Sequence, residues 1–143
     1  MSDPNAVAAL LGGSCLMIMM IVVVIILIPA VFYLLTMQKA LTLAGDQYRT
    51  LNPGLVWLMF IPLFNIVWHF FVVMHVSKSV KAWGTAHGVD FGDGGWGIGL
   101  TACILHCCGI IPILGILASL AGLVCIILWW VKVAGFNTTM SRM

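Results

Sequence analysis

A long apolar stretch near the N-terminus constrains this chain most. No Asp, Glu, Lys or Arg occurs from Pro4 to Gln38, and the residues from Ala6 to Met37 are strongly apolar. About 20 apolar residues are enough for one helix to cross a bilayer. The run has no internal turn that would divide it in two. It therefore predicts one long helix, tilted or extending beyond the bilayer, in which Pro29 can introduce a kink.

The composition of the whole chain places it in lipid. Of its 143 residues 63% are hydrophobic and 7% are charged, and the mean hydropathy is +1.18, whereas a globular domain is about 25% charged. A soluble protein so poor in charge could not cover its surface with polar groups, so the expected partner is the lipid bilayer. The few basic residues are scattered singly, which excludes a basic face for nucleic acid.

A second charge-free run covers the 38 residues 94–131. One helix of that length would measure about 57 Å, nearly twice a hydrocarbon core of ~30 Å. Gly109, Pro112 and Gly115 lie near its middle and favour a tight turn. Another apolar segment follows Asn52-Pro53, where Asn suits a helix N-cap and Pro the first helical turn.

Together these segments predict an all-α fold, a polytopic transmembrane helical bundle of one domain. We expect four spans, at about residues 8–37, 55–76, 96–111 and 113–133, and a loop at 77–95. The alternative has three spans, in which the third segment is re-entrant or the run 94–131 forms one bent helix.

The charges and the tryptophans agree with four spans. In that arrangement one side of the membrane holds four basic residues and the other side two, so the positive-inside rule places both termini in the cytoplasm. The four are Lys78, Lys81, Lys132 and Arg142, and the two are Lys39 and Arg49. Five tryptophans lie near expected span ends, where aromatic belts form. Trp68 lies inside the second expected span and does not follow this pattern.

Three polar residues inside the expected spans are candidates for a functional site. Asn65 and His69 lie one turn apart on one helix face, and His106 lies in the third span. Counted from the loop 77–95, Asn65 and His106 are both about 15 Å deep, and His69 is about 5 Å shallower. The favoured interpretation is an Asn65–His106 hydrogen bond that fixes helix packing, with no cofactor.

Two other interpretations of these residues stay open. Cys103 and Cys107 flank His106 on one helix face, so with His69 they offer ligands for zinc or copper, and two histidines on facing helices can hold haem iron. A polar path past Asn65, His69 and Thr101 is instead consistent with a small channel or carrier.

The fourth expected span carries a stripe of small residues, namely Gly115, Ala118, Ser119 and Gly122. Small residues three and four apart allow helices to approach closely, either within one bundle or between subunits. The sequence shows no acid/base pair and no nucleophile with its base. The leading hypothesis is therefore a non-enzymatic scaffold or accessory subunit that forms a homo-oligomer or joins a larger membrane complex.

Two stretches, Asn52 to Trp83 and Ala121 to Asn137, resemble a loosely defined group of small bacterial membrane proteins of about four spans and no assigned function. The resemblance covers about a third of the chain. It implies a bacterial inner (cytoplasmic) membrane and a four-span layout, and it supplies no activity or catalytic residue.

Overall fold

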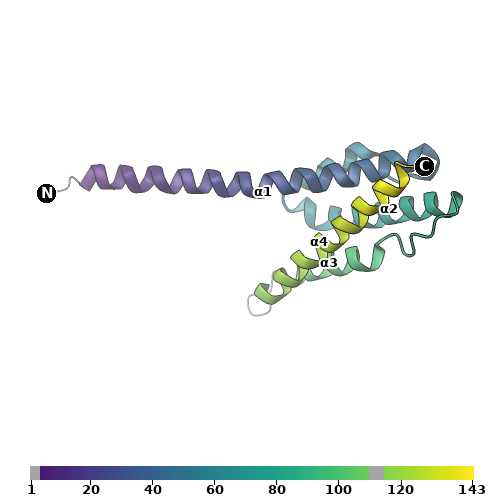
Figure 1. Cartoon of the computed structure of the whole chain (residues 1–143). Helices are drawn as coiled ribbons and strands as arrows, with labels where there is room; N and C mark the ends of the chain where they lie inside the picture. The colour runs from purple at the N-terminus through teal and green to yellow at the C-terminus, as the bar shows by residue number, and fades with distance from the viewer. Residues whose placement is uncertain (1–3, 110–114) are drawn as a thin grey trace. The chain divides into compact units, whose positions relative to one another are not determined.

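The computed structural model describes residues 4–109 and 115–143, and the side chains of those from residue 12 onward. Its elements are α1 (Pro4–Tyr48), a 3-10 helix η1 (Pro53–Phe60), α2 (Phe64–Ala86), α3 (Trp96–Cys108) and α4 (Gly115–Met140) (Figure 1). The described residues contain no strand. The predicted all-α fold is therefore confirmed for them.

The chain divides into two compact units, residues 1–33 and 34–143. The first unit holds most of α1 as a helix by itself. Every large side chain from Leu16 to Ile28 is apolar and 43–65% exposed. No polar face interrupts this surface, so this part of the helix has no side suited to water.

The second unit has a core formed by one face of each long helix. Leu34, Met37 and Leu41 in α1 recur at intervals of three and four, which places them on one helix face. Val73, Val76 and Val80 form the matching face of α2, and Trp129 and Val133 belong to α4. α1 leaves helical geometry at Gly45 (φ 72°, ψ 170°), where glycine tolerates the positive φ.

Helices α3 and α4 lie side by side in the second unit (Figure 1). Close approach depends on glycine at two points. A Cβ on Gly122 would lie 3.3 Å from Leu105 Cβ, and a Cβ on Gly99 would lie 2.5 Å from Val73 Cγ1 and 2.9 Å from Trp129 Nε1. The predicted turn at 109–115 falls largely on residues 110–114, which lie outside the described residues.

The second expected span, residues 55–76, is wrong as one continuous helix. Residues 53–60 form η1, the chain turns at 61–63, and α2 begins only at Phe64. Asn52 does act as a helix cap, because its side chain accepts a hydrogen bond from Gly54 N at 3.0 Å, but the helix that it caps is η1. Pro62 lacks an N–H, which disfavours a continuous helical ladder through 61–63.

The four-span arrangement is not supported. Among the described residues, two helices are long and apolar enough to cross a membrane, Gly12–Tyr48 and Gly115–Met140. α3 has 13 residues and so spans only about 20 Å. Within the region 77–95 that follows the second expected span, the polar turns expected to continue that helix to Trp83 belong to α2, which ends at Ala86.

Candidate functional site

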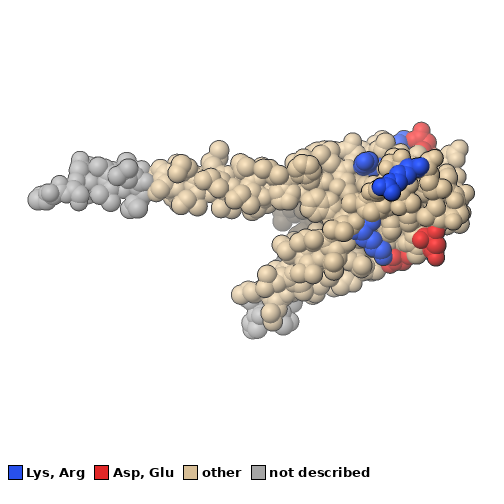
Figure 2. Space-filling view, in the orientation of Figure 1, with Lys and Arg blue, Asp and Glu red and all other residues tan. Residues whose placement is uncertain are grey.

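Seven of the nine charged residues of the second unit gather at one end, where α1, α2 and α4 finish. We call this the charged end, and it comprises Asp46, Arg49, Lys78, Lys81, Asp90, Asp93 and Lys132. Figure 2 shows that the visible Lys, Arg and Asp side chains of this unit cluster there, while the far part of the α3–α4 pair shows none. The charged side chains are therefore concentrated at one end of the unit rather than distributed over its whole surface.

Aromatic contacts join the chain segments that meet at the charged end. The Tyr48 ring at the end of α1 lies edge-on to His87, with centroids 5.9 Å apart. Trp83 stacks on His87 at 4.1 Å and lies 6.1 Å from Phe91. Phe91 in turn lies 4.7 Å from Phe136 of α4. The ends of three helices and the loop between α2 and α3 thus share one aromatic cluster.

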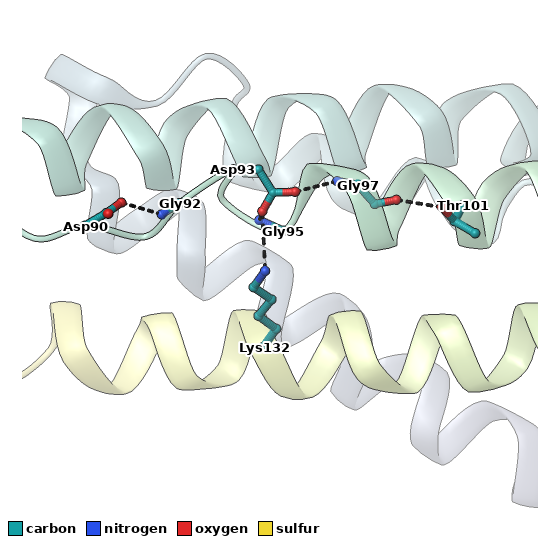
Figure 3. A network of polar contacts seen from close by, with 7 residues as sticks. All are labelled: Asp90, Gly92, Asp93, Gly95, Gly97, Thr101 and Lys132. Atoms are coloured by element: carbon teal, nitrogen blue, oxygen red, sulfur yellow. Dashed lines mark hydrogen bonds and ion pairs between the residues drawn. The ribbon is translucent and has the colours of Figure 1, made fainter.

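Asp93 is the best-connected charged group of this end (Figure 3). Its Oδ2 accepts a hydrogen bond from Gly97 N at 2.8 Å, and its Oδ1 accepts one from Gly95 N at 2.9 Å. Lys132 Nζ of α4 lies 3.3 Å from the same Oδ1. Asp93 thus satisfies backbone donors at the start of α3 and ties that start to α4.

The environment of Asp93 keeps its side chain ionised. The Gly97 N–H lowers the pKa of this carboxyl below its usual value most strongly. Gly95 N–H and Lys132 lower it further, against an opposing effect of partial burial. Asp93 lies three residues before the start of α3, and the N-cap position itself is occupied by Gly95. The sequence analysis did not predict these contacts of Asp93.

The predicted polar residues are only partly brought together. His69 is half-buried, with its ring 6.4 Å from that of Trp129. Asn65 and His106 are exposed. In the part of the chain that the structure describes, the Asn65 side chain forms no hydrogen bond with His106.

The candidate metal ligands form no complete cluster. Cys103 is buried, Cys107 is half-buried, and all five cysteines are free. In the part of the chain that the structure describes, no group of three or more His, Cys, Asp or Glu side chains could hold a metal ion. His69 and His106, the two predicted nitrogen ligands, lie on α2 and α3, which contact each other. Thr101, on the expected polar path, is exposed and donates to the Gly97 carbonyl at 2.8 Å.

The small-residue stripe packs within the chain. Gly115 and Gly122 are buried against α3, and a Cβ on Gly109 would come within 2.8 Å of Ser119 Oγ. Ala118 is half-buried. The stripe thus allows α3 and α4 to approach closely, which is one of the two uses that the sequence left open.

Three polar contacts between distant segments escaped the sequence analysis. Trp130 Nε1 donates to Thr36 Oγ1 at 2.8 Å, and Asn137 Nδ2 donates to the Thr36 carbonyl at 2.9 Å. These contacts fasten α4 to α1. Trp57 Nε1 donates to Gln38 Oε1 at 2.7 Å and fastens η1 to α1. The indole N–H of a buried tryptophan usually has a hydrogen-bond partner, but the sequence does not identify that partner.

No family model matches this chain, and no significant match was found among curated proteins or solved structures.

Proposed function

We propose that this chain is an integral membrane protein that acts as a non-enzymatic helical scaffold. The observation that carries the proposal is the exposed face of α4. Eight large apolar side chains on it are 46–74% exposed, namely Ile116, Leu117, Leu120, Leu123, Val124, Ile127, Leu128 and Val131. An apolar surface of this length is unfavourable in water and suits hydrocarbon.

The sorting of charges supports the same placement. Along α4 the apolar face ends where Lys132 begins the charged end, and Lys132 reaches Asp93 there. From Lys132 back to Gly115 is about 26 Å of helix, close to the thickness of a ~30 Å hydrocarbon core. The charged end then lies at the membrane surface, and the apolar part of α4 lies in lipid.

The basic residues of the charged end favour the cytoplasmic side. The C-terminal residues of α4 finish at that end, so we place Met143 in the cytoplasm. The segment 12–33 is long enough, at about 33 Å, for one crossing. The expectation that the N-terminus is also cytoplasmic stays a prediction.

Two features support the scaffold role: the polar side chains mostly join helices within the chain, and large apolar faces stay exposed. The bonded polar side chains described above mostly hold helices together, as Thr36 does for Trp130 and Asn137. Within α2, Ser79 Oγ donates to the backbone carbonyl of His75 at 2.7 Å and not to the His75 imidazole ring. The exposed faces of α4 and of residues 16–28 offer apolar contact to other helices. The two-histidine pair and the exposed Thr101 support a cofactor site or a channel less directly, so we propose the scaffold.

The mass of the particle after gentle extraction tests this role. The full chain is extracted in a mild detergent, and its mass is measured by light scattering with the detergent contribution subtracted. We expect a particle larger than one chain of 15.5 kDa, through self-association or a co-purifying membrane protein. A strictly monomeric particle without a stoichiometric partner would contradict the scaffold role.

A further inference from the structure

We infer that η1 and the first half of α2 form a re-entrant hairpin, which enters the bilayer from the charged end and returns to it without crossing. Its partner is the hydrocarbon of the lipid acyl chains. The inference rests on the proposed membrane location and adds the path of residues 50–79 through it. It differs from the four-span arrangement, in which this segment crosses.

The two ends of the segment lie together. Thr50 N donates to Ser79 Oγ at 3.0 Å, and Thr50 Oγ1 lies 2.8 Å from His75 Nδ1. Thr50 follows Arg49, and Ser79 lies between Lys78 and Lys81, so both ends belong to the charged end. A crossing helix would place its two ends about 30 Å apart, on opposite membrane surfaces.

Between these ends, η1 and α2 run beside each other as a hairpin. Further from the charged end, Trp68 Nε1 donates to the Leu55 carbonyl at 2.8 Å, which joins α2 to η1. This contact explains why Trp68 departs from the pattern of tryptophans at span ends. From Ser79 to Phe64 is about 22 Å of helix, so the tip stops short of the far surface of a ~30 Å core.

The tip is apolar and protrudes. The chain turns at 61–63, and Leu63 there has φ 53° and is 87% exposed, the largest exposed fraction among the apolar side chains described. Ile61 and Phe64 beside it are also exposed, and Val67 follows on α2. The exposed amide of Asn65 is the polar exception. A surface of this composition is suited to acyl chains and unsuited to water.

Three backbone N–H groups at the turn of the hairpin form hydrogen bonds within the chain. Lipid offers no hydrogen bonds, so irregular backbone must be satisfied from within the protein. Ile61 N donates to the Leu58 carbonyl at 3.1 Å, Phe64 N to the Pro62 carbonyl, and Asn65 N to the Ile61 carbonyl at 2.9 Å. Pro62 at the turn has no N–H to satisfy. The turn is thus closed by its own hydrogen bonds.

Labelling of single cysteines with a membrane-impermeant maleimide tests the path of the segment. Gln47→Cys lies before the hairpin, Lys81→Cys lies after it, and Leu63→Cys lies at the tip; all three positions have exposed side chains. In the parent protein the accessible cysteines are replaced by serine and the buried Cys103 is kept, so that its labelling gives the background. Ile61→Cys is a second tip variant in case Leu63→Cys does not accumulate.

We expect Gln47→Cys and Lys81→Cys to be labelled from the same side of intact membranes, near completion from that side and near background from the other. The tip cysteine should resist labelling from both sides and react after detergent is added. Labelling of Gln47→Cys and Lys81→Cys from opposite sides, or of the tip from the side opposite the charged end, would overturn the hairpin. Failure of both flanking cysteines to react from either side would also overturn it.

Alkaline carbonate extraction of the same membranes separates this inference from the proposed function. Release of the protein into the soluble fraction would contradict the membrane location itself. Retention in the membrane together with opposite-side labelling would contradict only the re-entrant path.

Discussion

Gly94→Ala is expected to destabilise the second unit by about 2–5 kcal/mol. Gly94 has φ +65°, and an L residue in this left-handed region costs roughly 1–2 kcal/mol. In addition, a Cβ on Gly94 would overlap the backbone carbonyl oxygen of Ser77 in α2. A backbone atom inside a helix cannot move aside cheaply, and overpacking of this kind costs about 1–3 kcal/mol. The measurement is the free energy of unfolding in detergent, followed by circular dichroism against a denaturing detergent.

Gly92→Ala is the matched control for that variant. Gly92 lies two residues away with φ +60°, and a Cβ there would meet nothing within 4 Å. It therefore carries the same backbone cost, about 1–2 kcal/mol, without the clash. Equal destabilisation by the two substitutions would contradict the close contact between Gly94 and the Ser77 carbonyl of α2.

Leu120→Arg is expected to reduce the membrane-integrated, folded protein by on the order of 100-fold relative to the unmodified chain. Leu120 is exposed on the apolar face of α4 and lies 12 residues before Lys132, about 18 Å from the charged end. Arginine near the bilayer centre costs about 2.5–3.5 kcal/mol on insertion scales, and 1.4 kcal/mol corresponds to a tenfold change. The measurement is the amount of protein that remains in membranes after carbonate extraction.

Thr138→Arg tests whether position, rather than the added arginine, causes the loss. Thr138 is exposed on the same helix beyond Lys132, where we expect water and headgroups. We expect little change from this substitution. If Leu120→Arg were tolerated as well as Thr138→Arg, the apolar face of α4 would lie in water or against protein rather than in lipid.

Periodicity and composition predicted the helical class but not the path of the chain. The run from Ala6 to Met37 could hardly form anything but a helix, and α1 does cover it. The segment after Asn52 was also largely apolar, yet it folds as η1, a turn and α2. Hydropathy measures whether a segment suits lipid, and a re-entrant hairpin and a crossing helix satisfy that test equally. Pro62 was the local signal that the sequence analysis did not use to end a helix.

The candidate site was harder to predict, because its contacts are long-range. Asn65 and His69 could be placed on one helix face from their spacing, but their partners depend on how far α3 is shifted along α2. Counting residues from the loop matched His106 with Asn65, whereas the described structure has no hydrogen bond between these two side chains. Asp93 and Lys132 are 39 residues apart, and neither spacing nor charge reveals that they meet. By contrast, the close helix contact predicted at Gly122 follows from residue size alone, and the structure has it between α3 and α4.

The surroundings of Leu120 test the central claim most directly, since that claim places the apolar face of α4 in hydrocarbon. A nitroxide is attached to Leu120→Cys in the protein reconstituted into bilayers, and its collision rates with oxygen and with a water-soluble nickel chelate are compared. Oxygen concentrates in hydrocarbon and the chelate stays in water, so we predict frequent collisions with oxygen and few with nickel at Leu120. The same label at Lys81→Cys should show the reverse. Frequent collisions with nickel at Leu120 would contradict the membrane location of α4.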